Sequence, residues 1–478
     1  MIIMNFNSLA YAIFLPIVFI TYWVLPHKYR WLLLLLSSYY FYMSWNPKYV
    51  VLILLTTTVS YVAAILMEKQ TNKTAKQSIL ALTLVVCVGV LFFFKYFNFA
   101  FTNVAAFFNI FSIHLHPITL NLLLPVGISF YTFQTLSYVI DAYQGKVKPE
   151  KHFGVYATFI SFFPQLVAGP IERTNSLLPQ ITSKKEFDYD LAMLGVRQML
   201  WGFFKKIAVA DVVAVYVDAA YKNLHQCTGL DLCFAIFFFT IQIYCDFSGY
   251  SDIAIGTARL FGINLMTNFA SPYFATSVKE FWSRWHISLS TWFRDYVYIP
   301  MGGSRCSKVR NSINIIVTFL ISGLWHGANW TFVFWGGIHG LAQVIEKVFG
   351  LGEKNGGKIR KLLSWFVIFV FCNLTWVFFR ADSFADALYV IQHAIPGIGG
   401  IGSFGHINMG PDKRSLRYIL AVFFLVAVYD YATLKHDVIN LLKNKKIPCL
   451  VIEYVLVFLI IAALVNGTGS NQFVYFQF

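Results

Sequence analysis

Apolar segments long enough to cross a bilayer as helices, which takes about 20 residues, recur along the whole chain. This pattern predicts an all-α polytopic membrane protein with about 11–13 transmembrane or re-entrant helices. No long soluble stretch interrupts the apolar segments, so we expect a single transmembrane domain over residues 1–478. The clearest predicted helices cover residues 9–25, 31–45, 49–67, 79–94, 120–140, 153–167, 232–244, 313–325, 362–379, 418–429 and 450–465.

The pattern changes between Tyr189 and Tyr221, where Arg197, Lys205 and Lys206 are interleaved with apolar residues. This favours an interfacial or re-entrant amphipathic helix. The alternative is a short span whose lysines extend their charged ends toward water.

Four polar residues follow the apolar segment 232–244, namely Asp246, Ser248, Ser251 and Asp252. They predict either a tight external turn or a pair of carboxylates in a wet interior. The two carboxylates are too few and too loosely spaced to predict a metal site. The stretch 268–273 then reads as a loop that re-enters the fold.

Two early motifs place proline and glycine inside apolar segments: PVGISFYTFQ at 125–134 and FPQLVAGPIER at 163–173. Such residues are tolerated in a membrane helix where neighbours or cavity water satisfy the freed backbone groups. The motifs therefore indicate either kinked packing helices or the wall of a cavity. Gln165, Glu172 and Arg173 favour the cavity wall or its cytoplasmic mouth.

The stretch from Lys279 to Gly340 contains three histidines, His286, His326 and His339, among tryptophans and glycines. An ionisable side chain at membrane depth is costly and indicates a functional site, although a hydrogen-bonded core histidine is the alternative. His326 ends the apolar segment 313–325. His286 adjoins a helical stripe of Phe281, Trp285, Ser288 and Trp292, and we expect His339 to serve in packing.

Composition supports a membrane protein: 58% of the residues are hydrophobic, 18% aromatic and 12% charged, against about 25% charged in soluble proteins. The formal net charge of +15 fits either an anionic, phosphorylated partner or basic cytoplasmic loops beside anionic lipid. We favour the second explanation. The seven cysteines are scattered and show no metal-ligand spacing.

The distribution of basic loops predicts the topology. Lysine and arginine gather after the first, third and fifth apolar segments, and the loops between these are poor in charge. The positive-inside rule then places the N-terminus outside the cytoplasm. Residues 1–7 contain no basic residue and no cleavage site follows, so we expect an uncleaved first helix.

Four motifs in order make the resemblance to a known family specific. They are the two proline-glycine motifs above, FWSRWHISLSTWFRDYVYIPMGG at 281–303 and SGLWHGANWTFVFWGGIHG at 322–340. The chain resembles the membrane-bound O-acyltransferase family, and within it the bacterial branch of alginate and peptidoglycan O-acetylation. A final FVYFQF at 473–478 also resembles that branch. The resemblance covers the chain from about Pro125 onward.

This resemblance implies a helical bundle around a central funnel and a site built on two histidines. The invariant histidine of the family falls on His326, which we expect to be the catalytic base. His286 would orient the substrate or stabilise developing charge. A histidine suits this role because its ordinary pKa is near ~6.5. We further predict five substrate-binding residues: Trp285, Arg284, Trp325, Asp246 and Gln165.

The implied activity moves an acetyl group from a cytoplasmic thioester across the membrane for O-acetylation of a cell-envelope or extracellular glycan. The donor would be acetyl coenzyme A or another acyl thioester, with no tightly bound cofactor. No loop is long enough for a folded domain, so we expect an extracytoplasmic acetyltransferase partner. The protein would lie in the lipid bilayer of the cell inner membrane and bind no nucleic acid.

Three alternatives remain open at this stage. The chain could be a D-alanyl transfer protein of the teichoic-acid type, a polytopic transporter or flippase, or a scaffold that anchors a polysaccharide-modifying complex. The lack of an internal repeat and the Trp-His-Gly motif argue against the transporter.

Overall fold

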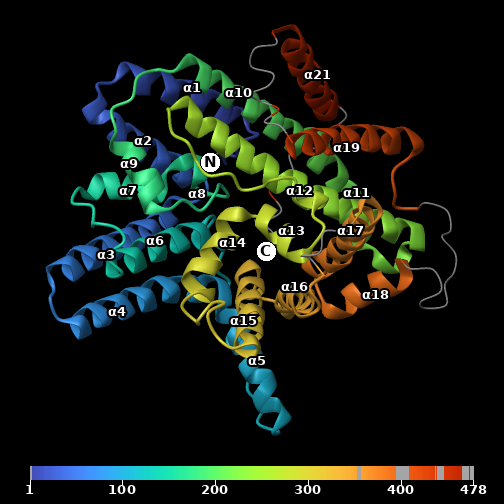
Figure 1. Ribbon diagram of the computed structural model, residues 1–478, viewed down its shortest axis with the longest axis horizontal. Helices are drawn as coiled ribbons and strands as arrows, with labels where there is room; N and C mark the ends of the chain where they lie inside the picture. The colour runs from blue at the N-terminus through green and yellow to red at the C-terminus, as the bar shows by residue number, and fades with distance from the viewer. Residues whose placement is uncertain are drawn as a thin grey trace. The chain divides into compact units, whose positions relative to one another are not determined.

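The computed structural model describes residues 3–351, 357–394, 408–435, 438, 446–465 and 473. Across these residues the chain forms helices joined by turns and irregular segments, and no strand occurs among them (Figure 1). The predicted all-α class is confirmed. The Gly-rich stretch after Pro396 and the C-terminal FVYFQF motif fall almost wholly outside the described residues.

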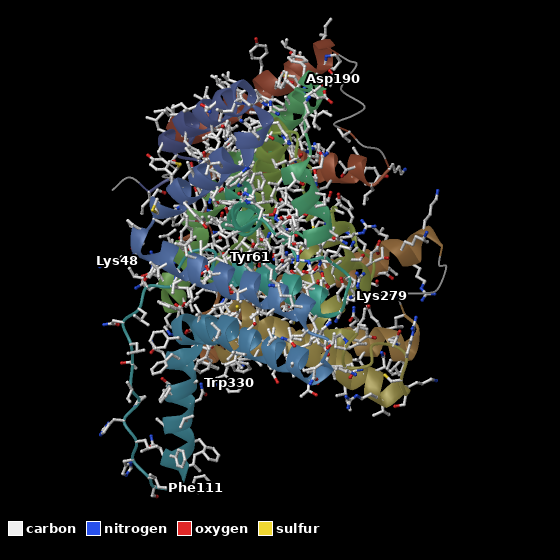
Figure 2. The ribbon with its side chains drawn as sticks, turned by 90° about the vertical axis from the view of Figure 1, so that its left-hand side faces the viewer. Lys48, Tyr61, Phe111, Asp190, Lys279 and Trp330 are labelled. Atoms are coloured by element: carbon white, nitrogen blue, oxygen red, sulfur yellow. The ribbon has the colours of Figure 1, made fainter. Side chains whose placement is uncertain are left out.

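The first of two compact units comprises residues 1–196 and 254–266. Within it, α3 packs against α4, α6 and α7, as the lower left of Figure 1 shows for α3, α4 and α6. A π-helical segment, η2 (Phe92–Tyr96), joins α4 to α5, and α5 turns away from α4 toward Phe111 (Figure 2). The helices of this unit are α1 (Leu9–Val24), α2 (His27–Met43), η1 (Pro47–Tyr49), α3 (Val50–Lys69), α4 (Lys73–Leu91), α5 (Phe97–Ile110), α6 (Ile128–Tyr143), α7 (Phe153–Ser161), α8 (Phe163–Leu166) and α9 (Thr174–Thr182).

The second unit comprises residues 197–253 and 267–478. Two helices, α10 (Tyr189–Phe203) and α12 (Gly229–Leu260), belong partly to each unit. The remaining helices of the second unit are η3 (Phe204–Ala210), α11 (Asp211–Lys222), η4 (Leu224–Gln226), η5 (Pro272–Phe274), α13 (Val278–Arg284), α14 (Ile287–Phe293), η6 (Arg294–Tyr298), α15 (Lys308–His326), α16 (Trp330–Phe349), α17 (Lys358–Arg380), α18 (Phe384–Ala394), α19 (Lys413–Thr433) and α21 (Lys446–Val465).

Six helical segments of the described chain are long and apolar enough to cross a membrane. They cover 47–69, 73–110, 229–260, 358–380, 413–433 and 447–465. The helix α1 is apolar but shorter. These segments coincide with predicted apolar runs, because continuous apolar sequence over about 20 residues is itself the signal for a membrane helix.

Two predicted helices differ from the structure because proline and glycine interrupt them. The segment predicted at 120–140 becomes helical only at Ile128, after Gly127 adopts a φ of +73°. A Cβ on Gly127 would lie 2.5 Å from the carbonyl oxygen of Leu166, so a larger residue would clash there. The segment predicted at 153–167 is divided into α7 and α8 at Phe162.

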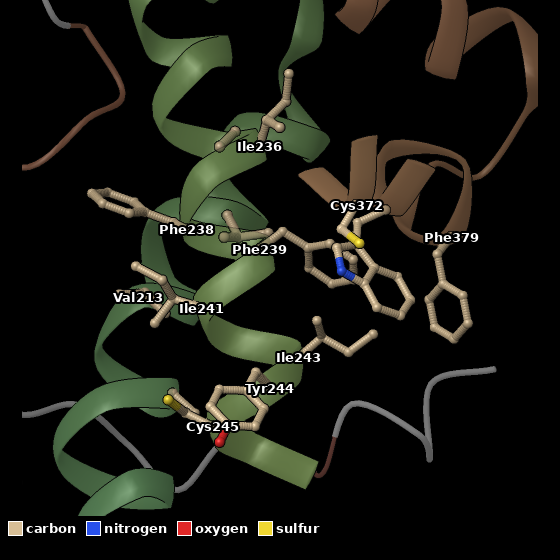
Figure 3. Close-up of a cluster of buried hydrophobic side chains, with 14 of the residues drawn as sticks. Val213, Ile236, Phe238, Phe239, Ile241, Ile243, Tyr244, Cys245, Cys372 and Phe379 are labelled. Carbon is tan, nitrogen blue, oxygen red and sulfur yellow. The ribbon is translucent and has the colours of Figure 1, made fainter. Parts of the chain in front are cut away.

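The core of the second unit gathers apolar side chains from α11, α12 and α17 (Figure 3). Phe238, Phe239 and Ile243 of α12 lie fully buried there, together with Cys372 and Phe379 of α17. This core fixes α12 and α17 against each other, and both helices carry side chains that surround the histidines described below.

Candidate active site

A close-packed hairpin of α15 and α16 positions His326. A Cβ on Gly323 would lie 2.2 Å from the carbonyl oxygen of Phe332, and one on Gly336 would lie 2.2 Å from that of Phe319. The two backbones can approach this closely only because both positions are glycine. His326 is the last residue of α15, as predicted, and is 3% exposed.

Aromatic rings enclose the His326 imidazole. Its ring centroid lies 4.8 Å from that of Trp325, 5.2 Å from Trp335 and 5.3 Å from Phe379. The space beside Gly327 is filled by the ring of Phe332, since a Cβ there would lie 2.2 Å from that ring. His326 therefore lies in an apolar cage contributed by α15, α16 and α17.

The backbone breaks at His286, between α13 and α14. His286 has a φ of +43°, a left-handed conformation that is uncommon for residues other than glycine. The loop before α13 stabilises the break: Ala270 N donates to the Arg284 carbonyl and Ile287 N donates to the Asn268 carbonyl, each at 2.9 Å. The predicted continuous helical stripe across 281–292 is therefore wrong, because these non-local hydrogen bonds end the helix at Arg284.

His286 is wholly buried and lies near Trp325. Its ring centroid is 6.2 Å from that of Trp325 and 4.6 Å from that of Phe247, which meets it edge to face. Its Nδ1 lies 3.1 Å from Asn268 Oδ1. Burial lowers the pKa of His286 to about 3, so the imidazole is neutral at physiological pH. The structure thus brings His286 and His326 close to the same indole, that of Trp325.

Trp285 lies in an aromatic layer beside these histidines. Its ring centroid is 5.0 Å from Trp376, which in turn stacks on Trp335 at 5.4 Å. Trp335 contacts His326 directly. Of the predicted substrate-binding residues, Trp325 and Trp285 therefore do lie with the histidines.

Arg284 and Asp246 make other contacts. Arg284 Nη2 pairs with Glu280 at 2.5 Å, one helical turn away on α13. Asp246 is 1% exposed and pairs at 2.8 Å with Lys206. Asp246 is nonetheless next to Phe247, the residue of α12 that touches His286.

Gln165 belongs to the first unit and is buried there. Its Nε2 donates to Gln134 Oε1 at 3.2 Å and to the Phe159 carbonyl at 3.1 Å. Glu172, further along the same motif, accepts a 2.5 Å hydrogen bond from Met266 N, and burial raises its pKa to about 7. In this unit Gln165 ties α6 to the segment that contains α7 and α8.

A buried ion-pair cluster joins η3 and α11 to α12, and the sequence did not predict it. Lys206 Nζ lies 2.8 Å from both Asp211 and Asp246, while Lys205 Nζ lies 2.5 Å from Asp252 and 2.8 Å from Ser248 Oγ. Lys205 and Lys206 are 4% and 3% exposed. The prediction of lysines reaching water is therefore wrong, because four carboxylate and hydroxyl partners hold both ammonium groups in the interior.

The same cluster corrects the prediction for α12. The helix runs without a break from Gly229 to Leu260, so the tight external turn expected near Asp246 does not exist. Asp246 does lie in the interior, as the alternative proposed, whereas the side chain of Asp252 is 20% exposed. Lysines neutralise them, and a helix can pass through such a cluster because the charges are paired.

A cavity of about 660 Å³ opens beside the histidines, between α13–α14 and α15–α16. Along α15 it is lined from Ile315 to Ser322, one turn before His326, and on α14 it is lined by Ile287, the neighbour of His286. Its wall also contains three cationic side chains, Lys279, Arg294 and Lys347. Sequence reasoning missed this cavity because its walls come from five helical elements, α13, α14, η6, α15 and α16.

His339 serves in packing, as predicted. Its Nδ1 accepts a hydrogen bond from Trp282 Nε1 at 3.2 Å, and its Nε2 lies 3.1 Å from Thr375 Oγ1. Within the described parts of the chain, no three His, Cys, Asp or Glu side chains are grouped as metal ligands.

Comparison with known proteins places this arrangement in context. The family model of the membrane-bound O-acyltransferases matches residues 151–378. The peptidoglycan O-acetyltransferase of Helicobacter pylori is 35% identical over 430 residues, which are 83% of this chain and 80% of that protein. The probable alginate O-acetylase AlgI of Azotobacter vinelandii is 38% identical over 89% of this chain and 85% of its own length. A teichoic acid D-alanyltransferase of Streptococcus thermophilus is 31% identical over 51% of this chain.

Proposed function

Because this chain belongs to the membrane-bound O-acyltransferase family, and is thus an O-acyltransferase, we propose that it moves an acetyl group from a cytoplasmic thioester across the membrane for O-acetylation of a glycan. One observation carries the proposal: two buried histidines, His286 and His326, lie close to Trp325, and a cavity of about 660 Å³ reaches Ile287 and Ser322 near them. The glycan would be peptidoglycan or an alginate-like polysaccharide.

We assign the roles from the chemistry of acyl transfer to a hydroxyl. His326 takes the hydroxyl proton while the hydroxyl oxygen attacks the thioester carbonyl. The tetrahedral intermediate then collapses to the ester and expels the thiolate, which receives the proton from His326. His286 orients the hydroxyl or stabilises the developing charge. The indoles of Trp325 and Trp285 shape the acyl path. The apolar cage around His326 excludes water, which would otherwise hydrolyse the ester.

The cavity supports entry of the donor from the cytoplasmic side. Its lining includes Ser304 and begins on α15 at Ile315. The basic residues Arg305, Lys308 and Arg310 lie between these two positions, and the positive-inside rule places them in the cytoplasm. Thioester donors carry phosphates on their pantetheine arm, and cationic side chains in the cavity wall suit such a group. Acetyl coenzyme A is the donor that we propose.

The proposal places the protein in the inner membrane and gives it an extracytoplasmic acetyltransferase partner. The observation in favour is that helices and short connections make up the described chain, while a glycan outside the membrane cannot readily reach a histidine that is 3% exposed. D-alanyl transfer is the second candidate, since one relative carries that name. An acetyl group is favoured over a D-alanyl group because the relatives named for O-acetylation match 83–89% of this chain, whereas the D-alanyltransferase matches 51% of it.

The test is acyl transfer by the purified protein in vesicles with radiolabelled acetyl coenzyme A. His326→Ala and His326→Gln should lower turnover by about 10²-fold or more, because a general base contributes 10²–10⁴-fold. The matched control is His225→Gln, an exposed histidine beside Tyr389 that should retain full activity. Wild-type turnover in the His326 variants would refute the assignment. Turnover with a D-alanyl carrier thioester and none with acetyl coenzyme A would favour the second candidate.

A further inference from the structure

We propose that Asn268 is a positioning residue that holds His286 with its proton on Nδ1, so that Nε2 of His286 carries the lone pair. This inference rests on the proposed function for the reaction in which His286 acts. It also excludes one of the two roles left open for His286, because an Nε2 without a proton cannot donate to a developing oxyanion.

The backbone N–H of Ser288 identifies the side-chain atom of Asn268 that faces it. The backbone N–H of Ser288 lies 3.2 Å from the side-chain oxygen of Asn268, and a backbone N–H has no acceptor capacity. The Asn268 atom at this point must therefore be the oxygen, Oδ1. The Ser288 hydroxyl donates to the same oxygen at 2.9 Å.

The third neighbour of this oxygen is the imidazole. His286 Nδ1 lies 3.1 Å from Asn268 Oδ1, which is an acceptor only, so Nδ1 must carry a proton to make the hydrogen bond. Burial lowers the pKa of His286 to about 3, and a neutral imidazole holds a single N–H. Nε2 is therefore the nitrogen with the lone pair.

Asn268 can hold the proton of His286 on Nδ1 because hydrogen bonds fix its own side chain and backbone. It is wholly buried, and its Nδ2 donates to Ser251 Oγ of α12 at 3.2 Å. Its backbone carbonyl accepts from Ile287 N at 2.9 Å, across the break that gives His286 its positive φ. Side chain and backbone of one residue thus set both the proton position and the ring orientation of His286, as partners of functional histidines commonly do.

Substitution of Asn268 tests the role. Asn268→Leu removes the acceptor oxygen at similar size, and we expect turnover to fall by about 10²-fold while KM for the donor changes by less than about threefold. Asn268→Asp restores an acceptor oxygen, so it should recover at least about tenfold of that loss. The control Asn373→Leu replaces an asparagine of α17 whose amide donates within its own helix, to Phe369, and should leave turnover unchanged.

Nitrogen NMR separates this inference from the proposed function. In protein labelled with ¹⁵N-histidine, the signals lost in His286→Gln belong to His286, and we expect its protonated nitrogen to be Nδ1 in the wild type. Asn268→Leu should shift the population toward the Nε2-protonated form. An Nε2-protonated wild type, or wild-type turnover in Asn268→Leu, would overturn the inference. Absence of acyl transfer by the wild type would instead overturn the proposed function and leave the NMR result standing.

Discussion

Lys206 pairs with two buried carboxylates of the second unit. It is 3% exposed and contacts two carboxylates, Asp211 and Asp246, at 2.8 Å each. A charge buried without a partner is far costlier than a paired one. The same arrangement places Phe247, the residue after Asp246, against His286.

Lys206→Met should destabilise the folded protein by about 3–5 kcal/mol, because it leaves both carboxylates in an apolar interior without their shared lysine. The triple variant Lys206→Met, Asp211→Asn, Asp246→Asn should recover most of this loss, since no buried charge of the trio remains. Thermal unfolding in detergent measures both. Equal destabilisation in the single and triple variants would show that packing of the lysine stem, and not charge pairing, is what stabilises this region.

Among single residues, the sequence identified the two histidines and the tryptophans Trp285 and Trp325, but not the side chains that hydrogen-bond to His286. The four motifs point to His326 and His286, and the structure places both beside Trp325. Asn268 was noted only as the start of a loop, because its role depends on a contact with His286 that spacing along the chain does not reveal. Arg284 is predicted from its nearness to His286, and Asp246 as a carboxylate in the interior; the structure shows each in an ion pair.

Among the elements, the α15–α16 hairpin determines where His326 lies. Its closest approach occurs at Gly323 and Gly336, where each glycine faces a backbone carbonyl oxygen of the other helix. A backbone oxygen cannot rotate away as a side chain can. A methyl group at either position must therefore push the helices apart and move the end of α15.

Gly323→Ala should lower acyl transfer by at least about tenfold, because a displacement of about 1 Å can cost as much as 10²-fold in rate. The matched control is Gly337→Ala on the same hairpin, where the added Cβ would meet only a side-chain atom of Leu320, at 3.3 Å. Turnover normalised to folded protein is the measurement. If both variants lose activity equally, helix propensity or expression and not close packing would be the cause.

Helices could be predicted from the sequence where a single local property, such as the length of an apolar segment, defines them. Apolar length located the spanning segments, and their ends agree closely for 362–379 and 450–465. Helix breaks were not predictable in the same way. The break at His286 depends on hydrogen bonds from residues 268–270, and the π-helical stretch at η3 accompanies two lysines that face α12. Periodicity treats such segments as continuous helices.

For the whole molecule, the connections between helices bear on how a glycan becomes acylated. The longest non-helical stretch within the described ranges runs from Phe111 to Gly127. A segment of that size is much shorter than ~40 residues, below which few domains fold unaided. It also contains no Lys, Arg, Asp or Glu. We expect contact with a partner there to depend on apolar burial, which is little affected by salt.

The partner that we propose would receive the acetyl group, on a serine hydroxyl for example, and pass it to the glycan. The reason is access: a polymer outside the membrane is too bulky to reach His326 inside its aromatic cage. Vesicles containing this protein, acetyl donor and glycan should therefore acetylate glycan slowly, and adding an extract of extracytoplasmic proteins should raise the rate by at least about tenfold, in line with the loss of a positioned acceptor. The gain should vanish with His326→Gln in the vesicles, which excludes an extract that works by itself, and should survive raised salt if the contact is apolar. An equal rate with and without the extract would show that this chain acylates the glycan directly and that no relay is needed.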